Sequence, residues 1–385
     1  MPTGQLQLNA IGAQDKVLTQ NPEVTFFKSV YRQHTNFSIE SVPQIMNNSA
    51  GLGGNGNPTT TSCTVSKSGG DLVHKMYIEM DIENESASVA SNWSTPTAHR
   101  IIKNVSIHIG GQLIDQHDGQ WLEIWNELTL DESKKDGYKK MIGCYDDSVN
   151  SKKRIYIPLQ FWFCRNPGLS IPIVSLQYPD IKITAKLNRK ENVGDIEITE
   201  KTFRLWVDYI FLDKMERRKF SQSSHEYLIE QLQKNPAKLP QHKPRQPITN
   251  QVYLNHPVKF LAWVSRKTTE NDFKYEPLGL TTLKLNGDTR VSERDGSYFD
   301  TVQPYQHFPN VPMKNNSESR HINVYSFALK AADHQPSGTC NMSRIDSVQL
   351  ETVSNTNDEC DLDIYAMNYN ILRVMSGMCT LMYAN

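Results

Sequence analysis

Hydrophobic and polar residues alternate over many short segments of the chain, in the pattern of half-buried β-strands. In residues 105–109 an apolar side chain recurs at every second position, and Gly110-Gly111 follows. Two glycines readily adopt the positive φ angles of a two-residue hairpin turn, so a returning strand is expected from Leu113. Beyond the break at Asp118-Gly119, apolar residues fall at helical spacing, which predicts a short amphipathic helix around Trp121.

The same succession of features recurs in the second half of the chain. Another alternating segment ends at Asn286-Gly287, and an Asp295-Gly296 break again precedes aromatic residues. Residues 37–41 resemble 227–231, Gly111 matches Gly287, and residues 206–211 resemble 366–371, at offsets of 190, 176 and 160 residues. Because the order is preserved, we expect an internal duplication with shorter connections in the second copy.

Short alternating segments bounded by turn residues predict the remaining strands. Residues 59–67 and 72–82 are expected to pair with each other, and residues 227–233 fit a strand or a helix until the duplication favours a strand. No long helix alternates with the strands, which favours antiparallel sandwiches over a parallel α/β sheet. The predicted fold is all-β, with two consecutive eight-stranded antiparallel jelly-roll sandwiches (a double jelly roll) and short connecting helices. The other predicted strands are 37–45, 154–158, 161–164, 171–176, 181–187, 203–212, 258–264, 281–285, 324–329, 345–350 and 362–374.

Two helices and several loops complete this prediction. Asn21-Pro22 is typical of a helix start, and Phe26, Phe27, Val30 and Tyr31 would then share one face and clamp the first domain. A second, charged helix is expected at residues 213–222. The predicted divisions are an N-terminal arm (1–24), a first jelly roll (25–213), a junction (214–224) and a second jelly roll (225–385). Loops are predicted at 51–61, 83–96, 131–147, 235–247, 265–273 and 314–320.

Composition and charge narrow the functional classes. The 385 residues suit two domains, and 41 basic against 42 acidic residues give a formal charge of −1, so no global field attracts nucleic acid. No apolar run approaches the roughly 20 residues of a membrane span, and the N-terminus lacks the pattern of a signal peptide. The six cysteines are scattered without a CxxC pair, which favours reduced thiols in an intracellular setting over zinc or a disulfide framework, although an even number permits bridges.

Several long segments resemble one known family. They are NPEVTFFKSVYRQHTNFSIES from Asn21, IGGQLIDQHDG from Ile109, WVDYIFLDKMERRKFSQSSHEYLIEQLQ from Trp206, LNHPVKFLAW from Leu254, GSYFDTVQPYQ from Gly296, YSFALKAADHQPSGTCNMSRID from Tyr325 and NYNILRVMSGM from Asn368. These segments look like the major capsid proteins of icosahedral large DNA viruses, especially of the phycodnavirus and iridovirus type. The resemblance follows nearly the whole chain in order.

The resemblance implies a structural virion protein rather than an enzyme, without a cofactor. It implies a homotrimer that forms a pseudo-hexagonal capsomer and contacts neighbouring trimers in an icosahedral shell. Further implied partners are minor capsid and penton proteins, and an internal membrane on the side of the N-terminal arm, with no direct contact to nucleic acid. The implied location is the virion capsid, assembled in the host cell cytoplasm.

Candidate chemical sites have weak sequence signals. His117-Asp118 and His225-Glu226 resemble acid and base pairs, but adjacent strand residues point to opposite faces, so neither pair is expected to converge on a substrate. Residues 152–154 and 217–219 are basic and are expected to form salt bridges rather than to bind nucleic acid. Trp121 and Trp125 could stack on a sugar, yet their spacing favours packing. Glycosylation sequons in predicted loops lie at Asn84, Asn92 and Asn315.

Two other functions remain open from the sequence. A minor or penton-associated jelly-roll capsid protein is possible, but a fivefold protein normally has a single jelly roll. A carbohydrate-binding β-sandwich protein would need a carboxylate pair or an exposed aromatic platform, and neither has a clear sequence signal.

Overall fold

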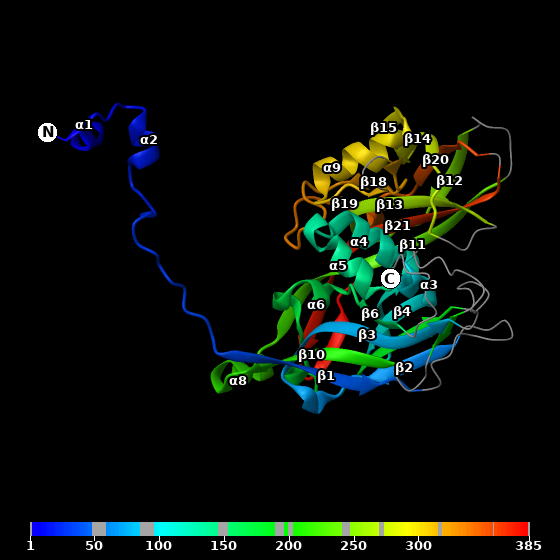
Figure 1. The fold of residues 1–385 in the computed structure, drawn as a ribbon, viewed down its shortest axis with the longest axis horizontal. Helices are drawn as coiled ribbons and strands as arrows, with labels where there is room; N and C mark the ends of the chain where they lie inside the picture. Colours follow the sequence, from blue (N-terminus) through cyan, green and yellow to red (C-terminus); the bar gives the residue numbers. More distant parts are fainter. Residues whose placement is uncertain are drawn as a thin grey trace. The chain divides into compact units, whose positions relative to one another are not determined.

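The computed structural model describes residues 2–47, 59–84, 96–144, 153–188, 196–198, 203–240, 247–268, 273–314, 318–356 and 358–383. The chain divides into two compact units, Met1–Asn36 and Phe37–Asn385, and the larger unit holds the β-sheets (Figure 1). Among the described residues, no helix is both long enough and apolar enough to cross a bilayer.

The first half of the larger unit contains two antiparallel sheets with a shared core. One sheet has the strand order β1-β10-β3-β6 and the other has the order β2-β8-β4-β5, while two short strands, β7 and β9, pair with β3. The strands are β1 (Phe37–Ile45), β2 (Thr60–Thr64), β3 (Leu72–Asn84), β4 (Ile102–Ile109), β5 (Gln112–Asp118), β6 (Lys153–Pro158), β7 (Ile171–Pro172), β8 (Ile181–Leu187), β9 (Ile196–Ile198) and β10 (Arg204–Leu212).

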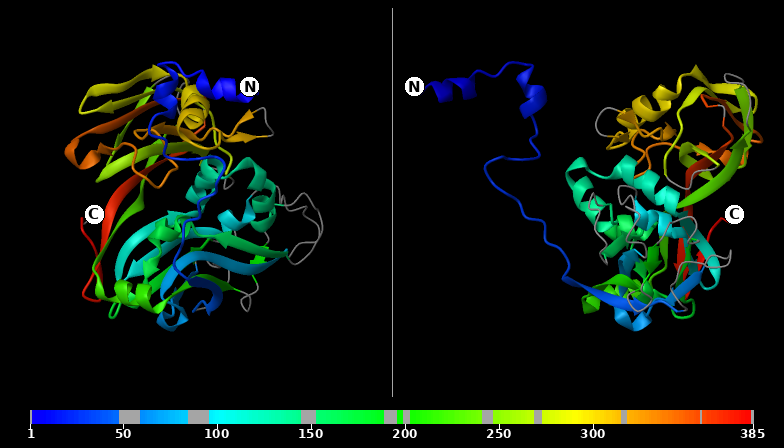
Figure 2. Two further views of the ribbon diagram at one scale, coloured as in Figure 1. Left: turned by 90° about the vertical axis from the view of Figure 1, so that its left-hand side faces the viewer. Right: turned by 45° about the vertical axis from the view of Figure 1, so that its right-hand side comes forward.

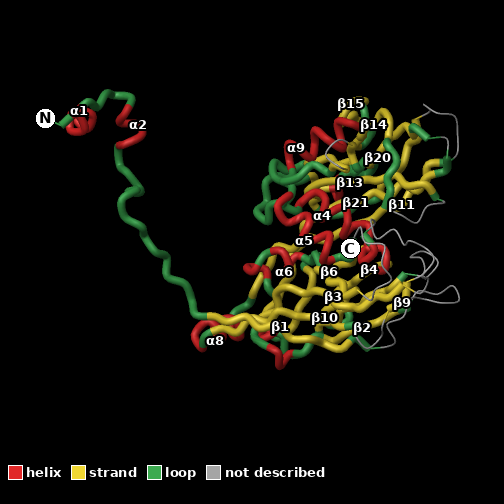
Figure 3. Tube along the Cα trace, viewed as in Figure 1, coloured by secondary structure: helices red, strands yellow, loops and turns green. Residues whose placement is uncertain are grey.

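The second half repeats this arrangement with strand orders β11-β21-β13-β18 and β12-β20-β14-β15. Figure 3 shows the two groups of strands, with helices beside and between them. The strands are β11 (His225–Leu239), β12 (Pro247–Val252), β13 (Pro257–Lys267), β14 (Leu278–Leu285), β15 (Asp288–Arg294), β18 (Asn323–Ser326), β20 (Val348–Ser354) and β21 (Cys360–Met375), with shorter β16 (Met313–Lys314), β17 (Glu318–Ser319), β19 (Cys340–Asn341) and β22 (Met378–Leu381).

The two halves are therefore copies of one topology, and the predicted double jelly roll is confirmed. In each half, the first strand pairs with the last long strand. The opposing sheet has four strands, which follow the same order in both halves. Ile39 pairs with Ile210 in the first half, and Ile229 pairs with Asn370 in the second. Adding the predicted offset of 190 to Ile39 gives Ile229, and adding the predicted offset of 160 to Ile210 gives Asn370.

The hairpin at the centre of each copy also follows the prediction. Gly110 and Gly111 have φ angles of 59° and 83°, and Asn286 and Gly287 have 51° and 86°. Two successive positive φ angles define the turn whose twist matches that of the flanking strands. Each hairpin leads to a helical segment: α4 (Gly119–Thr129) after β5, and η5 (Tyr298–Val302) with α9 (Gln303–His307) after β15.

Buried side chains form three clusters. One fills the first half and includes Ile107, Ile157 and Ile183, and another fills the second half around Trp263. The third joins α4 of the first half to β13, β18 and β21 of the second. Ile229, Leu372, Val374 and Cys379 of the second half also belong to the first cluster, because β11 and β21 continue alongside the first half (Figure 2).

The remaining helices connect the strands. The predicted junction helix is confirmed as α8, whose N-cap Asp213 accepts a hydrogen bond from the Glu216 N–H at 2.8 Å. The predicted charged link contains α5, which begins after Asp131. The other described α-helices of the larger unit are α3 (Thr97–Ile101), α5 (Glu132–Met141), α6 (Trp162–Arg165) and α8 (Lys214–Gln222), and its described 3-10 turns are η1 (Lys67–Gly69), η2 (Pro167–Leu169), η3 (Ile173–Ser175) and η6 (Met342–Arg344).

The predicted helix after Asn21-Pro22 is wrong. Residues 21–36 contain no helix, and Phe26 and Phe27 are almost fully exposed. A short amphipathic helix is stabilised mainly by burying its apolar face, and these side chains are not buried. The described helices of the smaller unit are instead α1 (Thr3–Asn9) and α2 (Asp15–Thr19), neither of which has a buried residue.

The predicted pairing of residues 59–67 with 72–82 is also wrong. Both segments form strands, but β2 pairs with β8, whereas β3 pairs with β10 and β6 in the opposite sheet. The chain between them passes over the ring of Tyr209, and a Cβ on Gly69 or Gly70 would lie within 2.7 Å of that side chain. These glycines permit a close crossing rather than a hairpin turn.

Three element boundaries differ from the prediction. The predicted strand 161–164 is wrong, since residues 162–165 form the helical turn α6 with Phe161 at its N-cap. A short apolar run does not distinguish a strand from a buried helix. Of the predicted strand 171–176, only β7 is extended. Strand β11 continues into the predicted loop 235–247 and includes Pro236, which is tolerated because β11 is an edge strand.

Several predicted loops contain strand residues at their ends. Strand β3 extends to Asn84, β13 extends to Lys267, and β16 pairs with β17 within the predicted loop 314–320. Residues 51–58 of the loop predicted at 51–61 and most of the loop predicted at 83–96 lie outside the described residues, while residues 60 and 61 belong to β2.

Candidate functional site at the seam between the two halves

The contact between the halves, here called the seam, centres on α4 and β5 of the first half and β11, β13 and β21 of the second. Helix α4 starts at the predicted Asp118-Gly119 break, where the Asp118 carboxylate accepts a hydrogen bond from the Trp121 N–H at 2.8 Å. A Cβ on Gly119 would lie 2.0 Å from the carbonyl oxygen of His99. Only glycine therefore allows α4 to begin this close to α3.

One face of α4 is aromatic and packs on the second half. Trp121 is fully buried, and its ring centroid lies 5.3 Å from that of Tyr365 and 6.2 Å from that of Phe260. Phe260 and Tyr365 project from the side of β13 and β21 opposite to Trp263, which faces the core of the second half. The prediction that Trp121 and Trp125 serve packing is thus confirmed.

Another face of α4 carries two buried carboxylates that bind a cation from the second half. Arg320 Nη1 lies 2.8 Å from Glu123 Oε1 and 3.2 Å from Glu127 Oε1. His99 Nδ1 donates to Glu123 at 2.8 Å, and its Nε2 lies 3.0 Å from the Tyr138 hydroxyl. Two carboxylates on one helical face would repel each other, so Arg320 offsets this repulsion across the seam.

The two carboxylates differ in their proton affinity. Burial favours a higher pKa for Glu123, but the hydrogen bond and charge of His99, with the charge of Arg320, hold this pKa below its ordinary value. Burial raises the pKa of Glu127 above its ordinary value, because the attraction of Arg320 is partly offset by the charge of Glu123. Glu123 is therefore the stable anion of the pair, and Glu127 is the group nearer to protonation.

Two further ionic contacts cross the seam. Lys234 Nζ lies 2.8 Å from Asp118 Oδ2, and the Tyr365 hydroxyl donates to the same oxygen at 2.8 Å. Arg165 Nη1 lies 2.7 Å from Glu230 Oε2, while the guanidinium of Arg165 covers the ring of Trp125 at 4.4 Å. Asp118 thus both caps α4 and binds the second half, so the helix and the seam depend on one carboxylate.

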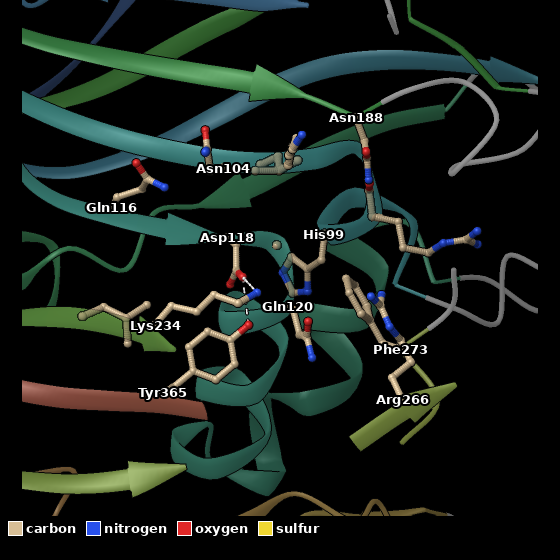
Figure 4. Close-up of a pocket in the computed structure, with 15 residues that line it drawn as sticks. His99, Asn104, Gln116, Asp118, Gln120, Asn188, Lys234, Arg266, Phe273 and Tyr365 are labelled. Carbon is tan, nitrogen blue, oxygen red and sulfur yellow. Dashed lines mark hydrogen bonds and ion pairs between the residues drawn. The ribbon is translucent and has the colours of Figure 1, made fainter. Parts of the chain in front are cut away.

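A cavity of about 400 Å³ lies beside the seam (Figure 4). Its walls come from α3, β4, β5 and α4 of the first half and from β11, β13 and β21 of the second. In Figure 4, Asp118, Lys234 and Tyr365 are joined on one side of the cavity, and Arg266 lies beside Phe273 on the other. The cavity is polar, and both halves contribute charged groups to it.

Two surfaces expose apolar or aromatic side chains. On the outer side of the β1-β10-β3-β6 sheet, the Tyr77 ring stacks on Trp206 and contacts Tyr156 edge-on, both at 6.0 Å, and all three side chains are half-buried. In the second half, Tyr305 of α9 and Leu329 are exposed, and His307 Nδ1 contacts the Leu329 carbonyl at 3.0 Å. Exposed aromatic patches mark candidate contacts between proteins.

The predicted acid and base pairs do not converge. His117 is buried, with its Nε2 3.0 Å from Asp115, whereas Asp118 binds Lys234 on the other side of the strand. His225 contacts the Phe220 carbonyl, and Glu226 pairs with Arg373. Within the described part of the chain, no group of three or more His, Cys, Asp or Glu side chains could hold a metal.

The remaining candidate residues fall into two groups. Arg154 pairs with Glu79 and Asp81, and Arg217 pairs with Asp71, which confirms the salt-bridge interpretation for these two residues. Asn84 lies in β3 rather than in the predicted loop, while Asn92 and Asn315 lie outside the described residues. The cysteines form no disulfide, consistent with the predicted thiols. They are Cys63, Cys144, Cys164, Cys340, Cys360 and Cys379.

The sequence prediction missed the charged residues of the seam. Arg320 lies 197 residues from Glu123, and Lys234 lies 116 residues from Asp118. The available signal was the spacing of Glu123 and Glu127, two acids four residues apart in a helix that also carries Trp121, Leu122, Ile124, Trp125 and Leu128. Like charges at this spacing repel each other, so a cation beside them would be favourable, but the sequence does not show whether that face is buried or which cation approaches it.

Comparisons with known proteins cover both halves. Residues 25–213 match the family model described as the major capsid protein N-terminus, and residues 216–380 match the model described as the large eukaryotic DNA virus major capsid protein. The chain is 42% identical to the major capsid protein of Pyramimonas orientalis virus and 35% identical to that of Paramecium bursaria Chlorella virus 1, and each alignment covers 100% of both proteins.

Solved structures give the same picture. A chain of the PBCV-1 virus capsid quasi-atomic model superposes with a TM-score of 0.81 at 33% identity, covering 94% of this chain and 100% of that one. The Faustovirus major capsid protein superposes with a TM-score of 0.72 over 95% of this chain and 94% of that one. At 13% identity, the latter likeness concerns the fold alone.

Proposed function

The chain belongs to the major capsid protein family of large eukaryotic DNA viruses, and we propose that three copies form a capsomer with a near-hexagonal outline. As a member of this family, it is a structural protein of the virion capsid. The observation that carries the proposal is the repeated strand order of two halves joined by a buried seam. Three such chains supply six similar jelly rolls, and rings of this shape tile an icosahedral shell.

The contact between chains repeats the contact within the chain. Inside the chain, α4 follows the β4–β5 hairpin and packs on the outer side of the second half's sheet. The second half has its own hairpin, β14–β15, followed by η5 and α9. In a ring of alternating first and second halves, α9 of one copy faces the outer side of the β1-β10-β3-β6 sheet of the next.

The chemistry of the two surfaces supports this pairing. Tyr305 on α9 and Leu329 beside it offer exposed apolar area. Tyr77, Tyr156 and Trp206 offer aromatic rings on the outer side of the receiving sheet, as Phe260 and Tyr365 do on the equivalent sheet at the internal seam. Aromatic rings bury a large area at little entropic cost, so they are effective contact residues.

Light scattering of the purified protein tests the proposal. We expect a mass of about three times the 44.0 kDa of one chain. Tyr305→Glu should dissociate the trimer, because a carboxylate would be buried without a partner. Tyr253→Glu is the matched control, since Tyr253 is 77% exposed and Tyr305 is 79% exposed, but Tyr253 lies between β12 and β13. A monomeric wild type, or equal dissociation of both folded variants, would contradict the proposal.

A minor or penton-associated capsid protein is a weaker candidate, because one jelly roll suffices at a fivefold position. A carbohydrate-binding protein is weaker again, since Trp121 and Trp125 are buried and cannot stack on a sugar. The same experiment separates these candidates. A monomer whose thermal midpoint rises with added sugar would favour carbohydrate binding, and a pentamer would favour the fivefold position.

We also propose neighbouring trimers, minor capsid proteins and penton proteins as partners, and an internal membrane on the side of the arm. The arm carries the exposed apolar side chains Leu8, Val17 and Leu18, and Phe26 and Phe27 directly after it are also exposed, which supports a partner for this segment. Assembly in the host cytoplasm remains a proposal supported by the family resemblance. The division at residues 24, 213 and 224 likewise remains a proposal, supported by strand pairing within 37–212 and 225–381.

A further inference from the structure

Strand β1 leaves one edge of its sheet unpaired. It pairs with β10 along its whole length and with no other described strand. Pro43 has no N–H, so its nitrogen must face away from β10, and the backbone groups of Ile39 and Ser41 then face the same free edge. Ile39 is 54% exposed and Ile45 is 80% exposed. A long, apolar, unpaired edge of this kind is a template for another strand.

The equivalent edge in the second half is covered. Strand β11 occupies the position of β1 there, and its Leu232 N–H donates to Asp115 of β5 at 3.1 Å. The Gln231 side chain also donates to the Ile114 carbonyl of β5. Within the described residues β1 has no such cover, and the shared topology of the two halves favours a cover supplied by another chain.

Residues 24–31 of the smaller unit, VTFFKSVY, have the composition of a strand. Six of these eight residues are β-branched or aromatic, yet the segment forms neither a strand nor a helix, and Val24, Phe26 and Val30 are exposed. A hairpin onto β1 of the same chain would need a turn in residues 32–36, and the described backbone has none there. This favours the edge of a second copy.

We infer that residues 24–31 of one copy add an antiparallel strand to the free edge of β1 in a second copy. One register suits both sequences, because it places Lys28, the single cation of the segment, opposite Glu40, the single anion of β1. Neither residue has an ion-pair partner among the described residues. In this register Phe26 lies opposite Val42, whose side chain packs on the core of the first half. The added strand thus extends that core.

The exchange rests on the proposed assembly of copies and adds a link between them. Backbone hydrogen bonds along the added strand supply the affinity, and the side chains set the register. The connection from Tyr31 to Phe37 spans at most about 20 Å when fully extended. Because Tyr31 of the donor lies opposite Phe37 of the acceptor, the two copies of Phe37 must lie within about 25 Å of each other.

Disulfide trapping in the purified full chain tests the exchange. Lys28→Cys combined with Glu40→Cys should give linked pairs or triples of chains on a non-reducing denaturing gel after mild oxidation. Lys28→Cys combined with Ile45→Cys is the matched control, because Ile45 is exposed on the same strand but lies out of register. The single variants report links to the native thiols. A link within one chain, or equal yields from the two combinations, would overturn the inference.

The period of a strand gives a second test. Phe26 and Phe27 are 93% and 98% exposed, but they point to opposite faces of the added strand. Phe26→Asp should make the β1 amides exchange hydrogen about tenfold faster, and Phe27→Asp should change this rate less. Equal effects would contradict strand addition.

Light scattering of the same samples separates the exchange from the proposed trimer. A trimer whose chains cannot be linked would overturn the exchange and leave the proposed trimer standing. Linked pairs from a dimeric protein would support the exchange and overturn the trimer.

Discussion

Replacing Arg320 with glutamine should strongly destabilise the protein. Glu123 and Glu127 are both 3% exposed, and Arg320 binds both of them from the other half. Removing one partner of a buried ion pair costs about 3–5 kcal/mol, because the remaining charge stays desolvated. The Arg320 side chain is itself 28% exposed, so we expect about 3 kcal/mol, the lower end of this range.

The loss of stability caused by Arg320→Gln should decrease as the pH falls. Burial already raises the pKa of Glu127, and loss of Arg320 removes its main opposing attraction. A carboxyl whose folded pKa exceeds its unfolded value binds more protons in the folded state, so its contribution to stability increases as the pH falls through the folded pKa. The difference between Arg320→Gln and the wild type should therefore shrink between neutral pH and the ordinary titration range of glutamate.

Urea unfolding at fixed protein concentration, followed by tryptophan fluorescence, measures both effects, since Trp121 and Trp125 lie on the same helix as the two carboxylates. Arg373→Gln is the control, because Arg373 is 38% exposed and pairs with Glu226 on the surface. That exposed pair should contribute less than about 1 kcal/mol. Equal losses in the two variants, or a penalty independent of pH, would refute the role assigned to Arg320.

Two further predictions concern the turns and the thiols. Gly111→Ala and Gly287→Ala should each lower the free energy of unfolding by roughly 1–2 kcal/mol, because both residues have φ above 80°. This loss comes from the backbone conformation, since a Cβ at either position would meet no atom within 4 Å. Gly137→Ala within α5 should instead raise the free energy of unfolding by about 0.5–1 kcal/mol, and urea unfolding of the three variants checks the difference in sign. Burial raises the pKa of Cys144, Cys164 and Cys379 to about 12. These thiols should therefore react slowly with maleimide at pH 8 in the native protein and quickly in urea. Mass spectrometry of the labelled protein measures both rates, and rapid labelling of the native protein would contradict the prediction.

The strands that the sequence predicts well are those with one buried face. In β8, Ile181, Ile183 and Ala185 are buried while Lys182 and Lys186 are exposed, so alternation alone identifies both ends of the strand. The hairpins are equally clear, because their turn residues need positive φ angles. In contrast, residues 161–164 are buried on every side and carry no period from which to distinguish a strand from a helical turn.

The seam could not be predicted in the same way. Its aromatic face was detectable from the spacing of Trp121 and Trp125 within the helix. The cations that complete it come from segments more than a hundred residues away, and no local pattern identifies Arg320 or Lys234 as partners of α4. The helix predicted from Asn21 failed for a related reason, since local capping signals cannot show whether a surface will bury its apolar face.

The aromatic face of α4 has a consequence for how the protein is made. Trp121 and Trp125 are covered by Phe260 and Tyr365, which leave the ribosome much later than α4 does. At a synthesis rate of about 5–20 residues per second, the nascent chain carries this apolar helix uncovered for roughly ten seconds or more. Until those last strands emerge, the helix exposes aromatic surface that favours non-native contacts and aggregation.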